Sequence, residues 1–253
     1  TMAGTNSQAL GDYLRVFGTK SDDSISGTWA SEAIRGRGGD DTLHGGGGND
    51  NLRSGNGNDK LIGGSGNDQI KALQGADLLA GGAGRDFLYG GRGNDTLRGG
   101  FGDDAVWGES GSDNLSGQKG DDLLLGGDGN DRLWGGDGND TLFGERGRDF
   151  IGGGAGDDIL TGGRIGQDGD GQRDVFIFRS SNLGSGGFDR VTDFERNFDQ
   201  IDLRSFGFDD FFEDVLSRAS GTANDTKIEF GQGDVLYIEN LPISELDSSL
   251  VIL

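Results

Sequence analysis

The sequence predicts an all-β repeat protein, and two observations carry this prediction. First, residues 18–161 divide into sixteen units of nine residues without an insertion or deletion, and such a short period is typical of repeat architectures. Second, position 8 of every unit is aliphatic, while position 6 is Asp in fifteen units and Glu in the other. We number the positions 1 to 9 in each unit, starting at Gly18.

Each unit predicts a turn followed by a short strand. Positions 1 to 6 are rich in glycine, which tolerates positive φ, so we expect them to turn. Positions 7 to 9 would form a strand with position 8 on one face and its neighbours on the other. The 54 Gly and net charge of −22 are also typical of disorder, but the sixteen-fold registration argues against it. Collagen is excluded because Gly does not recur at every third residue.

The composition excludes several classes of site and partner. The chain has no Cys and one His, so disulfides and thiolate metal sites are absent. It has no apolar run of about 18 residues, so we expect no transmembrane segment. An acidic chain is also a poor partner for nucleic acid, which attracts clusters of Lys and Arg.

Two nearly identical units follow one another at residues 126–144, GGDGNDRLWGGDGNDTLFG. This pattern, G-G-x-G-x-D-x-U-x with U aliphatic, resembles the calcium-binding nonapeptide of repeats-in-toxin (hemolysin-type) proteins. The resemblance covers residues 18–161 and implies a parallel β-roll, a calcium-bound β-solenoid with two nonapeptides per coil. Units 18–26, 27–35 and 72–80 depart furthest from the pattern.

In such a roll the carboxylates of position 6 would stack into two columns, about 4.8 Å apart from coil to coil. Neighbours would repel by roughly 3 kcal/mol per pair at an effective dielectric constant of 20. Ca²⁺ takes six to eight oxygen ligands, so carboxylates and exposed carbonyls of two coils would suit it better than Mg²⁺ or Zn²⁺. The alternative is that these side chains only cap turns. We therefore expect multiple Ca²⁺ ions as the cofactor.

The predicted ligands are the position-6 aspartates of the regular units. They are Asp41, Asp50, Asp59, Asp68, Asp86, Asp95, Asp104, Asp113, Asp122, Asp131, Asp140, Asp149 and Asp158. Weaker metal sites are expected at Asp23, Glu32, Asp77, Asp168 and Asp170.

Two features make some of these sites less certain than others. Units with a charged residue at position 2, namely Arg37, Glu109 and Glu145, are expected to hold weak sites or none. Residues 162–173 interrupt the period. The alternation of Asp168, Asp170, Gln172 and Asp174 resembles the start of an EF-hand loop, but Arg179 stands where its last Glu would be, which leaves both a separate calcium site and an ordinary acidic loop open.

The segment after residue 174 predicts a conventional core, because ten of the fifteen Phe lie there. Its stretches DVFIF and FDRVTDFERNFDQIDLRSF resemble the segment that follows the repeats in serralysin-type proteases and calcium-dependent alginate epimerases. That resemblance implies that Asp193, Asp199 and Asp202 belong to an acidic strand-turn-strand that closes the roll. Further strands are expected at residues 226–230 and 235–238. The tail LPISELDSSLVIL resembles the tails of type I secretion substrates.

We therefore expect three parts. Residues 1–17 would be an N-terminal cap or the remnant of an upstream domain, and residues 18–161 the calcium-binding β-roll of sixteen nonapeptides. Residues 162–253 would be a β-rich C-terminal cap that also carries the type I secretion signal.

One outer face of the roll is expected to change from basic to aromatic along its length. Position 9 of the even-numbered units begins with Arg35, Arg53 and Lys71 and then becomes apolar. A contiguous apolar patch usually marks an interface. The C-terminal cap, an upstream domain, a carbohydrate or other partner, and a second copy of the chain all remain open as its occupant. The candidate partner surface is formed by Phe87, Tyr89, Trp107, Leu125 and Phe143.

The function predicted is that of a non-catalytic calcium-binding module. H-E-x-x-H, a nucleophile elbow and a phosphate-binding loop are absent, so the chain is not expected to be an enzyme, although it could be the C-terminal part of a larger secreted enzyme or toxin. It would be a bacterial extracellular protein that is exported by the type I secretion apparatus and folds on Ca²⁺ outside the cell. The alternative is a calcium-dependent adhesin or polysaccharide-binding module, of the alginate type, at the cell surface.

Overall fold

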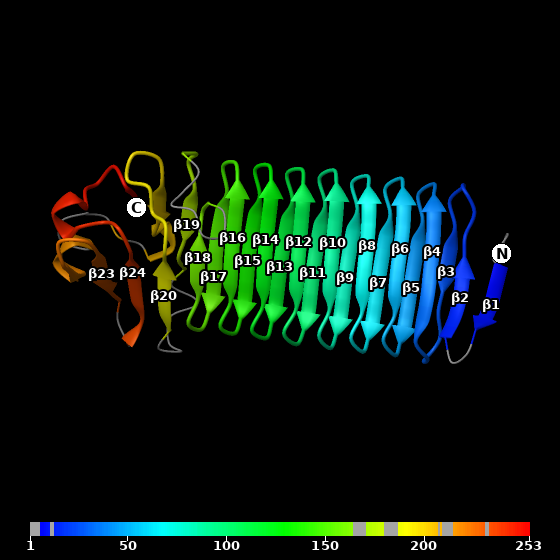
Figure 1. Cartoon of the computed structure of the whole chain (residues 1–253). Helices are drawn as coiled ribbons and strands as arrows, with labels where there is room; N and C mark the ends of the chain where they lie inside the picture. Colours follow the sequence, from blue (N-terminus) through cyan, green and yellow to red (C-terminus); the bar gives the residue numbers. More distant parts are fainter. Residues whose placement is uncertain are drawn as a thin grey trace.

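Two facing β-sheets form one elongated roll in the computed structural model of this chain (Figure 1). The structure describes residues 6–10, 13–163, 171–179, 187–206, 208, 215–230 and 233–253, and side chains from residue 14 onward. Consecutive strands of the roll alternate between the two sheets, so every second strand returns to the same sheet. This confirms the parallel β-roll with two nonapeptides per coil.

The first sheet has fourteen strands in the described residues. In spatial order they are β1 (Asn6–Leu10), β2 (Tyr13–Phe17), β4 (Glu32–Gly38), β6 (Asn51–Asn56), β8 (Gln69–Gln74), β10 (Phe87–Arg92), β12 (Ala105–Ser110), β14 (Leu123–Asp128), β16 (Thr141–Arg146), β18 (Ile159–Thr161), β20 (Phe188–Val191), β24 (Val235–Ile238), β23 (Thr226–Glu229) and β22 (Ala219–Gly221).

The second sheet has eleven strands in the same described ranges. They run in the order β25 (Val251–Ile252), β21 (Gln200–Asp202), β19 (Val175–Ile177), β17 (Phe150–Ala155), β15 (Arg132–Asp137), β13 (Asn114–Lys119), β11 (Thr96–Phe101), β9 (Leu78–Ala83), β7 (Lys60–Ser65), β5 (Thr42–Gly47) and β3 (Ser24–Ser26). Short 3₁₀ turns in the C-terminal part are η2 (Arg204–Phe206), η4 (Leu216–Arg218) and η6 (Ile243–Glu245).

The register of the roll is fixed by its aliphatic residues. Leu61 of β7 pairs with Leu79 of β9, which pairs with Leu97 of β11, a step of 18 residues each time. All sixteen position-8 side chains are at most 3% exposed. Because this set is buried between the two sheets, a slip of one residue would turn it toward solvent. The predicted core is therefore confirmed.

The strands are longer than the three residues expected from the sequence. β7, for example, includes positions 1 to 3 of the next unit as well as positions 7 to 9, so only positions 4 to 6 turn. The glycines therefore lie within the sheet as well as in the turn. Position 2 is a local distortion of the strand, because its φ is positive in most coils, even where Glu109 (74°) replaces Gly.

The two ends of the roll are closed differently. At the N-terminal end, β1 pairs antiparallel with β2, and β2 pairs in parallel with β4. At the other end, both sheets continue into a C-terminal cap, which we define as the described residues from 171 onward. The expected strands at 226–230 and 235–238 are confirmed as β23 and β24. Phe176 and Phe194 form part of the cap's apolar core.

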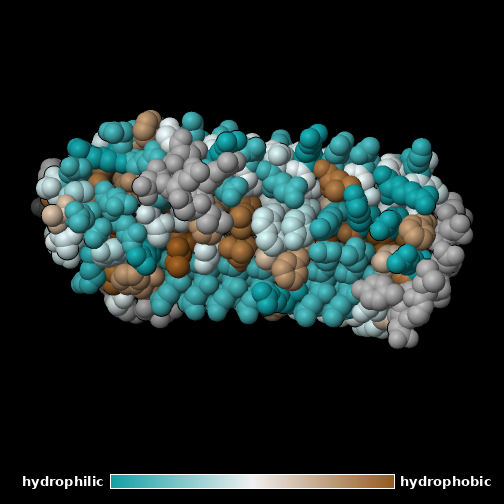
Figure 2. Space-filling model, in the orientation of Figure 1, coloured by the Kyte–Doolittle hydropathy of each residue, from teal (hydrophilic) through white to brown (hydrophobic). Residues whose placement is uncertain are grey.

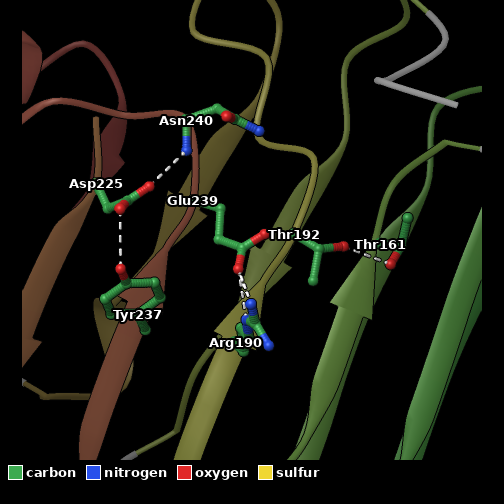
Figure 3. A network of polar contacts seen from close by, with 7 residues as sticks. All are labelled: Thr161, Arg190, Thr192, Asp225, Tyr237, Glu239 and Asn240. Atoms are coloured by element: carbon green, nitrogen blue, oxygen red, sulfur yellow. Dashed lines mark hydrogen bonds and ion pairs between the residues drawn. The ribbon is translucent and has the colours of Figure 1, made fainter. Parts of the chain in front are cut away.

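Ordinary side-chain pairs hold the cap to itself and to the last coil (Figure 3). The hydroxyls of Thr161 in the roll and Thr192 in the cap lie 2.8 Å apart. Arg190 forms an ion pair with Glu239. The Tyr237 hydroxyl donates to Asp225 at 2.9 Å. Each of these contacts is made by side chains of the chain itself.

The surface of the roll is largely hydrophilic, but apolar atoms interrupt it over the middle of the face that Figure 2 shows. Among the described residues, no helix has the length and apolar character needed to cross a membrane.

Candidate metal centre

The position-6 carboxylates form two columns, one along each edge of the roll. In each column, an Asp Oδ1 accepts a hydrogen bond from the backbone N–H of the column residue one coil earlier. Asp95, for example, donates from its backbone to Asp113 Oδ1 at 2.7 Å. The links that join the predicted ligands are 2.7 to 2.9 Å long. All thirteen predicted ligands are thus brought into these columns.

The second carboxylate oxygen has no such partner. This atom, Oδ2, is buried and accepts no hydrogen bond in fourteen of the described aspartates. They are Asp41, Asp50, Asp59, Asp68, Asp77, Asp86, Asp95, Asp104, Asp113, Asp122, Asp131, Asp140, Asp149 and Asp158. A buried carboxylate oxygen without a hydrogen bond or a cation is strongly unfavourable. The same deficiency recurs in every regular coil, so it is a property of the repeat itself.

Glycine at position 1 leaves space in front of these oxygens. A Cβ placed on Gly126 would lie 2.5 Å from Oδ2 of Asp131 and 2.7 Å from the carbonyl oxygen of Gly144 in the next coil. A Cβ on Gly90 would lie 2.5 Å from Asp95 Oδ2 and 2.9 Å from the carbonyl oxygen of Gly108. Carboxylate and carbonyl oxygens of successive coils therefore face one space that only glycine keeps open.

Burial also changes the protonation of the columns. Desolvation raises the pKa of twelve position-6 aspartates from 3.8, to about 6 for most of them, and the charges of neighbouring aspartates raise many of them further. The pKa reaches about 7 for Asp77 and Asp104 and about 8 for Asp140. Backbone N–H donors oppose this rise. Without a cation, the columns therefore bind protons at a higher pH than ordinary aspartates do, and Asp77, Asp104 and Asp140 do so near neutral pH.

The donor set fits a hard divalent cation. No group of three or more His, Cys, Asp or Glu side chains that could hold a metal is found in the described residues, so the remaining ligands would be backbone carbonyls. Carboxylate plus carbonyl oxygen is the set that Ca²⁺ takes, with flexible coordination. The columns contain neither the thiolate nor the imidazole ligands that Zn²⁺ prefers.

The first two units differ from the regular ones. Asp23 Oδ2 accepts hydrogen bonds from the backbone and the hydroxyl of Thr19, at 2.5 and 3.0 Å. Glu32 is satisfied in the same way by Thr28. Hydrogen-bond donors of the chain thus occupy carboxylate oxygens whose equivalents accept no hydrogen bond in later coils. Weaker sites at Asp23 and Glu32 stay a prediction.

One column is altered in its third and fourth coils. Ser54 and Ala72 replace glycine at position 1, and both side chains are buried. In their own coils, their Cβ atoms occupy the space that corresponds to the one glycine leaves open beside Asp95 or Asp131. The Ser54 hydroxyl also donates to the Ala72 carbonyl at 2.9 Å. We therefore expect weaker metal binding beside Asp59, which the sequence grouped with the regular sites, as well as beside Asp77.

The columns continue beyond the repeats, which the period could not predict. Asp149 donates from its backbone to Asp174 Oδ1, and Asp174 donates to Asp199 Oδ1, across 25 residues each time. In the other column, Asp158 donates to Asp189 Oδ1 across 31 residues at 3.3 Å. In the sequence, these aspartates stand just before or at the start of an apolar strand, as in the repeats. The number of residues between successive column members differs, however, from the 18 of the repeats. Asp168 and Asp170 lie outside the described residues.

The predicted aromatic surface is a stack of rings. The Tyr89 and Trp107 ring centroids are 4.6 Å apart with planes 3° from parallel, and Phe87 stacks on Trp107 at 6.3 Å. Lys71 covers the ring of Tyr89. These side chains, with Leu125 and Phe143, are half-buried. Trp107 stacks against neighbouring rings within the roll, and the described residues of the cap extend the sheets at the end of the roll instead of covering this face.

Comparison with known proteins agrees with this architecture. The family model described as RTX calcium-binding nonapeptide repeat (4 copies) matches residues 15–43, 26–61, 35–70, 71–106, 107–142 and 134–164, more than half of the chain. No curated protein sequence matches the chain.

Two solved structures are similar. One is a subunit of the Azotobacter vinelandii mannuronan C5-epimerase (24% identity, TM-score 0.21), with 66% of this chain and 78% of that chain covered. The other is the extracellular lipase LipA from Serratia marcescens (17% identity, TM-score 0.21), with 94% of this chain but only 39% of the lipase covered.

Proposed function

The chain belongs to the RTX calcium-binding nonapeptide repeat family, and from this premise we propose that it is a module exported by a type I secretion system that folds on Ca²⁺ outside the cell. The repeats bind Ca²⁺ at multiple sites and form a structural, non-catalytic β-roll. The proposal extends this to the individual ligands, to export and to the timing of folding.

The unpaired Oδ2 atoms carry the proposal. We assign the ions to the spaces between successive coils of each column, with one carboxylate from each coil and carbonyls beside position-1 glycines as ligands. The assigned carboxylates are the thirteen predicted from the sequence, of which Asp59 would be a weaker site, with further weaker sites at Asp23, Glu32 and Asp77. Bound Ca²⁺ would supply the positive charge that each column lacks.

Export follows from the same electrostatics. Where free calcium is low, as in the cytosol, the neighbouring carboxylates within each column would repel one another and the roll would stay unfolded. An unfolded chain suits passage through a secretion channel. Extracellular modules bind Ca²⁺ in the range of about 0.1 to 1 mM, so millimolar calcium outside the cell would fold the chain. Binding free energy then becomes folding free energy.

The folding step is tested by far-UV circular dichroism of the purified chain during a calcium titration. A cooperative transition from coil to β-structure is expected near millimolar calcium, and the same concentration of magnesium should not produce it. A spectrum that is already folded in chelator at pH 7.5 and does not respond to calcium would contradict the proposal. Export itself is tested by expressing the chain with and without a type I apparatus.

A second candidate function is binding of a polysaccharide at the cell surface. The aromatic stack lies on the first sheet. The second sheet carries a separate hollow of about 380 Å³ between Phe101 and Trp134, with Ser116 and Gln118 in its lining. Phe101 is 62% exposed, so an aromatic face is available to a sugar there. Retention of the chain on immobilised glycans, and its loss in Phe101→Ser but not in Trp107→Ser, would support binding at this hollow.

A further inference from the structure

The N-terminal strands of the first sheet carry a concentration of positive charge. Val16, Ile34, Leu52 and Ile70 point into the core, so the residues beside them in the strands point outward. On β2, β4, β6 and β8 these outward positions, together with position 2, hold no carboxylate in a chain of net charge −22. The cations there are Arg15, Arg35, Arg37, Arg53 and Lys71.

Three of these arginines line one hollow. It has a volume of about 330 Å³, and Arg35, Arg37 and Arg53 line it together with Phe17, Gly55 and Leu73. Figure 1 shows the strands that carry them, β2, β4, β6 and β8, as neighbours near the N-terminus. The volume lies in the range of small-molecule sites, which begins at about 300 Å³.

The hollow arises where the repeat departs from its own pattern. Arg37, Gly55 and Leu73 are aligned at position 2 of three successive strands. Gly55 leaves a gap, while the side chains of Arg37 and Leu73 stand on either side of it. Both adopt the left-handed region, with φ of 94° and 101°, where a side chain is strained by about 1 to 2 kcal/mol.

The arginines of the hollow have no anionic partner in the part of the chain that the structure describes. Among the residues that the structure describes, no carboxylate forms an ion pair with Arg35, Arg37 or Arg53, although Arg37 lies 5.5 Å from the Phe17 ring centroid. In the cap, by contrast, Arg190 and Arg204 are each paired with a carboxylate. Three unpaired guanidinium groups around one gap are available to an external anion.

We propose that this hollow binds a phosphate monoester, which is a dianion near neutral pH, carried on a body of about monosaccharide size. Guanidinium groups match the oxygens of such anions with paired, charge-assisted hydrogen bonds. A single carboxylate would leave two of the three cations without a counter-charge, so a dianion fits better. Phe17 and Leu73 offer apolar contact to the body that carries the ester. The site is separate from the calcium columns and needs only the folded roll.

Isothermal titration calorimetry of the calcium-loaded chain tests the site. Glucose 6-phosphate is expected to bind at least tenfold more tightly than glucuronate or glucose 6-sulfate, which each carry one negative charge. No measurable binding of glucose is expected, and binding of the phosphate should weaken as salt is raised. Equal affinity for glucuronate would overturn the assignment to a dianion. Binding of glucose itself, or absence of binding of glucose 6-phosphate, would overturn the site.

The matched variants are Arg37→Gly and Glu109→Gly. Both restore glycine at a position 2 of positive φ, so both are expected to fold at least as well as the wild type, which circular dichroism in calcium verifies before each titration. Arg37→Gly is expected to weaken ester binding at least tenfold, whereas Glu109→Gly should not change it. Wild-type affinity in folded Arg37→Gly would contradict the proposal.

The same ester chemistry occurs in lipid headgroups, and a second arm separates the two sources. Flotation is measured with vesicles of phosphatidylcholine alone and with 20% phosphatidate added. Binding of glucose 6-phosphate without flotation supports a soluble ligand, and binding of both supports the ester site with a headgroup as its source. Flotation that persists in Arg37→Gly would contradict the assignment of the phosphate to this hollow.

Discussion

The roll and the cap both bury aspartates, but they satisfy them differently. In the regular coils, one oxygen of each carboxylate accepts a backbone N–H and the other has no partner. In the cap, Asp193 accepts from Gly162 and Gly163 with its two oxygens, and Asp202 is paired with Arg204. Asp199 likewise accepts from two backbone N–H groups. The roll leaves these oxygens open to external cations, whereas these cap carboxylates obtain their partners from the chain.

The largest expected effect comes from neutralising two neighbours in one column. Replacing one member of a buried charge pair costs about 3 to 5 kcal/mol, so the double variant Asp113→Asn, Asp131→Asn should raise the calcium concentration at the folding midpoint at least tenfold. The matched control is Asp103→Asn, Asp121→Asn, two exposed position-5 residues with the same change in charge. Circular dichroism gives both midpoints, and equal shifts would count against the columns as ligands.

The second-largest effect on the stability of the folded roll should come from removing calcium and changing the pH. In the metal-free chain, a pKa raised from 3.8 to about 6 to 8 means that the folded roll binds protons more tightly than the unfolded chain. The resulting stability is fully present below pH 3.8 and is lost as pH rises through 6 to 8. In chelator, we expect more β-structure at pH 4.5 than at pH 8.

With calcium present the direction reverses, because protons compete with the ion for the same oxygens. The calcium concentration at the folding midpoint should therefore increase as pH falls from 8 to 6. Circular dichroism at several pH values measures both effects. A metal-free chain that gains structure on going from pH 4.5 to pH 8 would contradict the account of the columns.

A smaller effect distinguishes glycines of the roll and the cap. Gly126→Ala places a Cβ against Asp131 and the Gly144 carbonyl, so it should lower the free energy of unfolding by about 3 kcal/mol, the upper end for overpacking. A Cβ on Gly233 in the cap meets nothing within 4 Å, and its φ of 95° makes Gly233→Ala cost only about 1 kcal/mol. Denaturant unfolding in calcium measures the difference, and equal losses would argue against a crowded space at position 1.

The smallest effect is a gain. Glu109 and Glu145 have φ of 74° and 77°, so replacing either by Gly relieves strain of about 1 to 2 kcal/mol but adds an entropic loss of about 0.5 to 1 kcal/mol. Each variant should stabilise the folded chain by about 0.5 kcal/mol. Thr96→Gly, at a regular strand position, should destabilise it. The midpoints of thermal unfolding in calcium compare the three, and a loss of stability in both Glu variants would show that the strain is not relieved.

Most of the fold follows from the sequence because the structure repeats with it. A constant step of 18 residues places every position-8 side chain in the core and every position-6 carboxylate in a column. The prediction fails where that step changes. Asp174, Asp189 and Asp199 join the columns after 25 or 31 residues, and only the three-dimensional stacking of the coils shows that they are equivalent to the repeat aspartates.

Two further features depend on contacts between coils, which a one-dimensional period does not contain. The period places Tyr89 beside Trp107, but the sequence does not show that their rings stack on each other. Similarly, Arg37 and Leu73 read as isolated departures from the repeat, whereas the register places them on either side of Gly55. The hollow is therefore a property of three coils together.

Hydrogen exchange measured by mass spectrometry, in calcium and in chelator at pH 7.5, tests the central claim most directly. In calcium, backbone amides of the roll and the cap should both be protected. In chelator, peptides from the roll should lose their protection, while peptides from the cap should retain a larger share of theirs. Protection of the roll that is the same in chelator and in calcium would contradict the claim that its buried carboxylates require the ion.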